Sequence, residues 1–135
     1  ALGMETDNAK KSEMAYATAA ALWQAKKLSQ ARTYAQKAIS FNENYGEPYI
    51  LLAQMYGSNP NWSDEPALNR CTYYVVIDKL QRAKAVDPSV TDKVNELIAT
   101  YARHTPQAKD LFMLGYKAGD RITIGGWIGE STTIR

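Results

Sequence analysis

One apolar helical face recurs in this chain after an interval of 34 residues. Each copy has apolar residues at positions i, i+4 and i+7, the spacing of one face of an α-helix. The two copies are Ala15, Ala19 and Leu22, followed by Tyr49, Ala53 and Tyr56. A fixed period of about 20–50 residues is typical of helical-repeat proteins, in which each unit buries its apolar face against its neighbour. The recurrence therefore predicts stacked helix pairs.

Capping and turn residues divide the chain into helical segments that cover about two thirds of it. The expected helices are residues 8–27, 29–41, 47–56, 67–86, 89–103 and 106–117. Ser29 and Thr105 are expected N-caps, and Pro48 suits a first turn, where its missing N–H costs nothing. Asp87-Pro88 ends the fourth helix. The segments form about three helix pairs.

A polar segment, residues 57–66, interrupts the second pair. The spacing from Tyr56 to its counterpart Tyr101 is 45 residues instead of 34, and this segment accounts for the excess. It is longer than a usual helix–helix connection. We therefore expect an insertion between the two helices of the second pair.

The tail of the chain changes from helical to strand periodicity. Residues 121–124 alternate polar and apolar side chains, and residues 132–134 are β-branched, so we expect a small β-hairpin. An isolated hairpin is marginally stable in water. Ile122, Trp127 and Ile134 are therefore expected to anchor it to the last helices, with Trp127 largely buried.

These patterns resemble the tetratricopeptide-repeat (TPR) family over residues 12 to about 117. The first-helix pattern of that family, W-x₂-L-G-x₂-Y, is approximated by Tyr49, Leu52, Ala53 and Tyr56. Second-helix spacing is matched by Ala31, Ala35 and Ala38, by Val76, Leu80 and Ala83, and by Ala108, Phe112 and Gly115. The resemblance implies an all-α fold, a right-handed solenoid of about three helix pairs with a C-terminal hairpin.

The implied organisation is a single domain over residues 1–135, with repeats at 8–118 and a hairpin cap at 119–135. The tail, which includes Gly125-Gly126-Trp127-Ile128-Gly129-Glu130, is also similar to the C-terminus of certain TPR proteins from Bacteroidetes. That similarity implies a bacterial periplasmic or cell-envelope location and a natural C-terminus at Arg135.

The residue inventory offers little for chemistry. There is one cysteine, Cys71, one histidine, His104, and no recognisable catalytic or phosphate-binding motif. We expect no catalytic residue, metal or cofactor, and hence no enzyme. Cys71 is expected to be a buried small hydrophobe, and His104 to meet the last carbonyls of a helix.

Charge and hydropathy limit the classes of partner that this chain is expected to bind. The 16 basic and 14 acidic residues give a net charge of +2 without a clustered basic excess, which argues against nucleic acid. No apolar run approaches the length of a membrane span. A protein or peptide is therefore the expected partner.

In a TPR solenoid, the first helix of each pair lines a concave groove that binds partners. In these first helices, the residues that follow the packing-face residues by one position are expected to line the groove. The aromatic residue of the inserted loop is expected to join them. These partner-binding candidates are Tyr16, Trp23, Glu47, Ile50, Gln54, Asn95 and Arg103, with Trp62 on the loop. Two alternatives stay open, because Tyr16 and Trp23 could pack against a preceding repeat and Trp62 could fold back as a plug.

The resulting hypothesis is a non-enzymatic protein-interaction scaffold that binds a peptide or partner protein in the groove. The alternative is the C-terminal docking or regulatory portion of a longer enzyme or cell-envelope machine.

Overall fold

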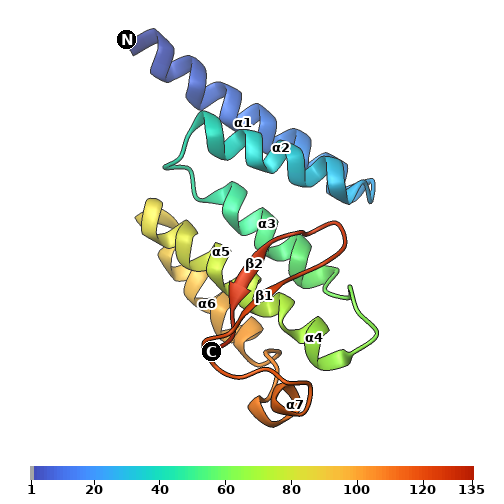
Figure 1. The fold of residues 1–135 in the computed structure, drawn as a ribbon. Helices are drawn as coiled ribbons and strands as arrows, with labels where there is room; N and C mark the ends of the chain where they lie inside the picture. Colours follow the sequence, from blue (N-terminus) through green and yellow to red (C-terminus); the bar gives the residue numbers. More distant parts are fainter. Residues whose placement is uncertain (1) are drawn as a thin grey trace.

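The computed structural model describes residues 2–135, which are mostly helical (Figure 1). The helices are α1 (Leu2–Gln24), α2 (Leu28–Phe41), α3 (Glu47–Ser58), α4 (Pro66–Arg70), α5 (Thr72–Val86), α6 (Thr91–Ala102) and α7 (Ala108–Met113). A 3₁₀ turn, Pro88–Val90, precedes α6, and the strands β1 (Arg121–Thr123) and β2 (Ser131–Thr133) follow α7. Helix makes up 66% of the chain, which confirms the expected two thirds. The small antiparallel sheet confirms the expected C-terminal strand pair, with Ile122 opposite Thr132.

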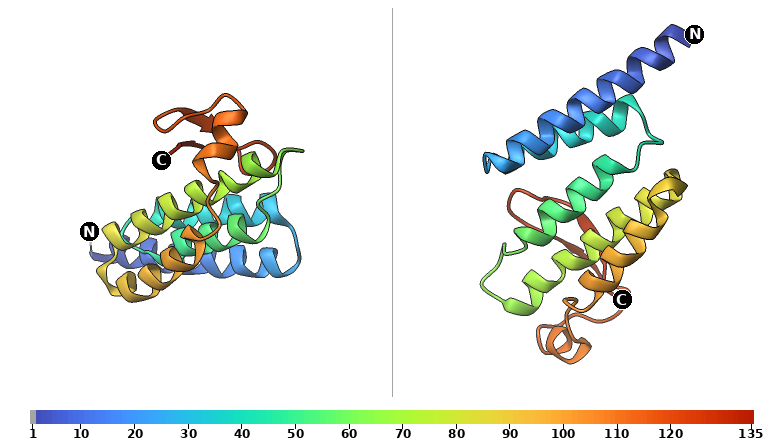
Figure 2. Two further views of the ribbon diagram at one scale, coloured as in Figure 1. Left: turned by 90° about the horizontal axis from the view of Figure 1, so that it is seen from below. Right: turned by 180° about the vertical axis from the view of Figure 1, so that it is seen from behind.

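Successive long helices run antiparallel and pack against one another (Figure 1). Contacts join α1 to α2, α2 to α3, α3 to α5, and α5 to α6. α1 also contacts α3 directly. The sheet and α7 lie together on one side of this helix array (Figure 2).

Small residues bring α1 and α2 close together. The alanines at this interface are all buried, as their spacing predicts: Ala15 and Ala19 on α1, and Ala31, Ala35 and Ala38 on α2. The separation of two packed helices depends on the size of the side chains between them, so alanine permits a close approach. The Ser12 hydroxyl donates a 2.6 Å hydrogen bond to the Ala38 carbonyl, which satisfies a buried polar group at that interface.

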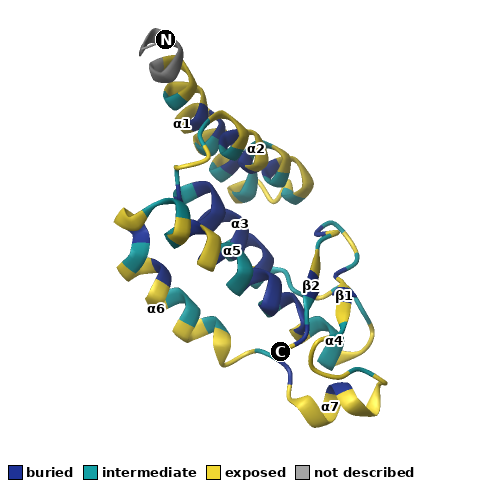
Figure 3. Ribbon diagram, turned by 60° about the vertical axis from the view of Figure 1, so that its left-hand side comes forward, coloured by how far each residue is buried: buried dark blue, intermediate teal, exposed yellow. Residues whose placement is uncertain are grey.

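α3 is the most deeply buried helix. Pro48 occupies its first turn, as expected, and eight of its twelve residues are buried (Figure 3). The six consecutive residues 48–53 are all buried, and six residues span more than one full turn of the helix. α3 therefore has neighbours on all of its faces.

Asp87 joins the turn before α3 to the turn before α6. Its carboxylate accepts a 2.9 Å hydrogen bond from the Gly46 backbone N–H and a 3.1 Å bond from that of Ser89. The Ser89 hydroxyl and then the Gly46 N–H hold the pKa of the Asp87 carboxyl below its usual value. A Cβ at Gly46 would lie 2.9 Å from the Asp87 Cβ, so this approach requires glycine.

Polar contacts join the hairpin to α2, α3 and α5. Of the expected anchors, Ile134 lines a cavity together with residues of α7, and Trp127 packs against Tyr56 of α3. The Thr132 hydroxyl donates to Asp78 of α5 at 2.7 Å, and Lys79 of α5 lies 2.7 Å from Glu130. The Tyr56 hydroxyl of α3 also donates to Glu130. Glu130 thus contacts side chains of α2, α3 and α5.

Four isoleucines of the tail, Ile122, Ile124, Ile128 and Ile134, are buried as part of the hydrophobic core. Trp127 is partly buried and packs against the core. Its ring meets Tyr56 edge-on, with the ring centroids 5.3 Å apart.

Some helix ends differ from the sequence prediction. The expected fourth helix is divided at Cys71 into α4 and α5, and neither Ser29 nor Thr105 caps a helix, since Lys27 and Gln107 hold those positions. The expected helix over 106–117 shortens to α7. Its end is set by Gly115, whose positive φ of 91° terminates the helix as a C-terminal glycine does.

The substitution Gly57→Ala should destabilise the fold. Gly57 lies on α3 where Tyr101 of α6 approaches, and an added Cβ would lie 2.6 Å from the Tyr101 Cε1 atom. Overpacking costs about 1–3 kcal/mol, which outweighs the gain of up to about 1 kcal/mol from alanine's helix propensity. Urea unfolding should therefore show a lower free energy of unfolding.

The neighbouring exposed change Ser58→Ala serves as the control and should alter stability by at most about 0.5 kcal/mol. The double variant Gly57→Ala, Tyr101→Leu should recover part of the loss. If Gly57→Ala is as stable as the parent chain, α6 does not pack against α3 as described.

Removing residues 121–135 should lower the unfolding midpoint and increase the binding of a hydrophobic dye. Burying one isoleucine side chain stabilises a fold by about 1.5–3 kcal/mol, and four would be lost. Thr123→Ala, on the exposed side of β1, is the matched control and should melt like the parent chain. An unchanged melt of the truncated chain would show that the hairpin is an independent appendage.

Candidate functional site

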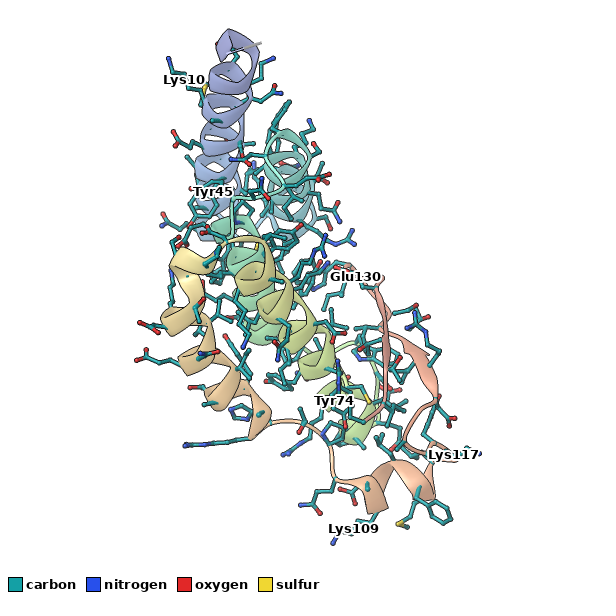
Figure 4. All side chains as sticks on the ribbon, turned by 90° about the vertical axis from the view of Figure 1, so that its left-hand side faces the viewer. Lys10, Tyr45, Tyr74, Lys109, Lys117 and Glu130 are labelled. Carbon is teal, nitrogen blue, oxygen red and sulfur yellow. The ribbon has the colours of Figure 1, made fainter. Side chains whose placement is uncertain are left out.

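Side chains from three helices meet near the α2–α3 turn. The Tyr16 ring of α1 contacts Tyr45 of the turn edge-on, with centroids 5.7 Å apart and planes at 68°. Glu47, in the first turn of α3, forms a 3.2 Å ion pair with Lys93 of α6. Figure 4 shows Tyr45 beside α1 and the start of α3. We call these four residues the interhelix cluster.

The residues of the interhelix cluster share an electrostatic environment. Burial raises the pKa of Tyr16, Glu47 raises it further, and Lys93 opposes the effect. Burial also raises the pKa of Tyr45, with smaller contributions from Tyr16 and Glu47. Both phenols are therefore neutral at physiological pH and can donate hydrogen bonds. The cluster combines two aromatic faces, two hydroxyl donors and one half-exposed ion pair, a set suited to recognition.

Ile50 is not a groove residue. Its side chain is 1% exposed, so the expectation that it contacts a partner is wrong. The assignment assumed that α3 has an open face one position past its packing face. That face is covered as well, because α3 lies inside the helix array.

The other groove candidates are spread over the surface. Trp23 and Gln54 are half-buried, and Trp23 packs against the core near the C-terminal end of α1. Asn95 accepts a 3.0 Å hydrogen bond from Lys84 of α5, which places it at the α5–α6 boundary. Arg103 is exposed just after α6. Among the predicted residues, the structure brings Tyr16 and Glu47 into one cluster.

Sequence reasoning missed Tyr45 and Lys93. Tyr45 lies in a turn, and only first helices were considered as groove walls. Lys93 lies two residues after the start of α6 and was not part of the repeating pattern. Its position opposite Glu47 depends on how α6 packs, which the sequence alone does not give.

Trp62 folds back onto the protein. Its indole Nε1 donates a 3.1 Å hydrogen bond to the Leu68 carbonyl, and its backbone N–H donates to the Asn69 side chain at 2.9 Å. The ring lies against the hairpin, where a Cβ at Gly125 would be 3.0 Å from Trp62 Cε3. This geometry favours the alternative in which Trp62 folds back onto the protein over the one in which it contacts a partner. The ring already joins the inserted loop to α4 and the hairpin.

The single cysteine and the single histidine have structural surroundings. Cys71 is buried, as expected, and burial raises the pKa of its thiol to about 11. The His104 imidazole stacks on Tyr73, with centroids 5.1 Å apart, and Tyr73 stacks on Tyr101. A cavity of about 360 Å³ opens beside this stack. The expected interaction of the His104 side chain with helix carbonyls is thus replaced by aromatic stacking.

Comparison with protein-family models, curated proteins and solved structures found no match to this chain. Within residues 2–135, no helix has the length and apolar character needed to cross a bilayer. Among the described side chains, residues 7–135, no three His, Cys, Asp or Glu residues are grouped as metal ligands would be. Function is therefore inferred from the geometry of the chain itself.

The substitution Trp62→Ala should reduce stability by about 2 kcal/mol, because it removes a partly buried indole and the hydrogen bond to Leu68. Thermal and urea unfolding measure this effect. The matched variant Trp62→Phe keeps the ring against the hairpin and should lose about 1 kcal/mol, the value of the hydrogen bond. An unchanged melt of Trp62→Ala would show that the ring adds nothing to the fold.

Proposed function

We propose that this chain is a non-enzymatic protein-interaction scaffold, built as a right-handed TPR-like solenoid of about three helix pairs. Support for the architecture comes from the 34-residue recurrence, the antiparallel packing of successive helices and the direct contact of α1 with α3. In such a solenoid, α1, α3 and α6 are the first helices of the pairs and line the binding surface.

The interhelix cluster is the observation that carries the proposal. It joins Tyr16, Glu47 and Lys93 from these three helices, together with Tyr45. Tyrosine is enriched among the residues that dominate binding energies at protein interfaces. A partner peptide or protein would lie over the two tyrosine rings and exchange hydrogen bonds with their hydroxyls and with the Glu47–Lys93 pair.

This version of the binding surface differs from the one predicted from sequence. Ile50 is part of the core and Trp62 closes the inserted loop, so neither belongs to it. Gln54 and Trp23 are half-buried and can extend the surface along α3 and α1.

The test begins with a partner isolated from the source organism on the intact chain and identified by mass spectrometry. Tyr45→Ala should then weaken binding of the purified partner by about 2 kcal/mol, which is roughly 30-fold in Kd, because truncation of a central tyrosine removes a dominant contact. Lys93→Glu should weaken it further by breaking the pair with Glu47. Isothermal titration calorimetry measures both effects.

Tyr34→Ala is the matched control. Tyr34 is a half-buried tyrosine of α2 that lies beneath Lys37 rather than in the interhelix cluster, so its loss should leave affinity unchanged. Circular dichroism confirms that each variant is folded. A partner whose affinity is altered by neither Tyr45→Ala nor Lys93→Glu binds elsewhere, and the groove proposal then fails.

A further inference from the structure

The end of α7 exposes consecutive apolar side chains. Phe112 is 75% exposed, Met113 is 83% exposed, and the adjacent Leu114 is also exposed. Elsewhere, Met14 and Phe41 are exposed singly. Contiguous exposed apolar residues mark interaction sites, whereas single ones are ordinary. We call Phe112, Met113 and Leu114 the α7 apolar surface.

A cavity of about 460 Å³ adjoins the α7 apolar surface, between α7 and the end of the chain. Its walls are mainly apolar and include Leu111, Phe112, Tyr116 and Ile134. This volume lies in the range of about 300–1,000 Å³ that is typical of binding pockets. The cavity can accept a large apolar side chain from outside.

The charged residues lining this cavity are all basic: Lys109, Lys117 and Arg135. Arg135 pairs with Asp78 of α5. Lys109 of α7 and Lys117 beyond its end, both labelled in Figure 4, form no ion pair with any of the described side chains, residues 7–135. Asp120 accepts a hydrogen bond from the Lys117 backbone and lines a neighbouring cavity rather than this one. The rim of this cavity therefore favours a negatively charged partner.

The surface is fixed before any partner arrives. Leu111 is 2% exposed and holds α7 to the rest of the protein, and Pro106 ahead of it is buried. The Tyr116 N–H donates a 2.9 Å hydrogen bond to the Leu111 carbonyl, which closes the end of the helix. A preformed site binds more tightly because little ordering is needed on association.

We propose that the α7 apolar surface and its cavity bind an acidic amphipathic segment of a partner protein. One or two large apolar side chains of that segment fill the cavity, and its Asp or Glu side chains pair with Lys109 and Lys117. The proposal does not depend on the interhelix cluster, whose Tyr45 lies well away from Lys109 and Lys117 (Figure 4).

The geometry disfavours the other possible occupants. A flat membrane surface does not fill a concave cavity, whereas an anchoring side chain does. A second copy of this chain related by two-fold symmetry would place the same patch against itself. That arrangement would bring lysines of like charge together, which is unfavourable.

Two fluorescein-labelled helical peptides test the proposal by fluorescence anisotropy with the full chain. Both carry the same Leu/Phe face, and their polar faces consist of Glu in one and Lys in the other. The Glu peptide should bind at least about tenfold more tightly, since the rim is basic. Phe112→Ser should weaken its binding at least about tenfold, and the double variant Lys109→Glu, Lys117→Glu should reverse the preference between the peptides.

Three controls make the outcome decisive. Met14→Ser removes an equally exposed but isolated apolar side chain, and Tyr45→Ala alters the interhelix cluster; both should bind the Glu peptide like the parent chain. Since Phe112 is exposed, Phe112→Ser should keep the parent melting temperature, measured by circular dichroism. A loss of binding in Tyr45→Ala equal to that in Phe112→Ser would place the peptide elsewhere and overturn the proposal.

Other results would overturn it as well. These are no binding of the Glu peptide, equal binding of both peptides, or a preference that survives the double charge reversal. Sedimentation with phosphatidylglycerol vesicles that is abolished by Phe112→Ser would identify a membrane contact instead. A dimer in analytical ultracentrifugation that becomes a monomer in Phe112→Ser would identify a second copy as the occupant.

Discussion

The burial of α3 is the constraint on which the rest of the structure depends. The consecutive residues Ile50, Leu51 and Leu52 point in different directions from this helix, and each is at most 4% exposed. A helix that is apolar on all sides is stable only when neighbours cover every face. Here α2 and α1 cover one side, α5 covers another, and the hairpin closes the flank between them. The tail is therefore part of the core and not an addition to it.

The hydroxyl group of Tyr56 shows how the hairpin is held in one position against the helices. Its hydroxyl accepts a 2.8 Å hydrogen bond from Arg32 of α2 and donates to Glu130 of the hairpin. Burial and the neighbouring Glu130 raise the pKa of Tyr56 far above its ordinary value, so the phenol stays a neutral donor. A buried hydroxyl without partners is costly, so Arg32 and Glu130 favour one docking position of the hairpin over others. Apolar burial supplies the driving force, and this hydrogen-bonded group fixes the arrangement.

Most helices and the strand pair could be predicted from sequence, because periodicity and turn residues report local structure. The complete burial of α3 was missed, which misplaced Ile50. The sequence feature that could have indicated this burial is the absence of any charged residue between Glu47 and Asp64. In the candidate site, Tyr16 and Glu47 were found from the repeat. Tyr45 and Lys93 were not, since their proximity depends on how turns and helices pack in three dimensions.

α7 and the hairpin contribute unequally to the core. Phe112 matches the second-helix spacing of a repeat, yet it is 75% exposed, because α7 has only six residues and buries only Leu111 among them. The hairpin covers the core instead, through its isoleucines and through Glu130. Since the hairpin stabilises the fold, α7 is free to present apolar side chains to water, an arrangement that a purely structural cap would not need.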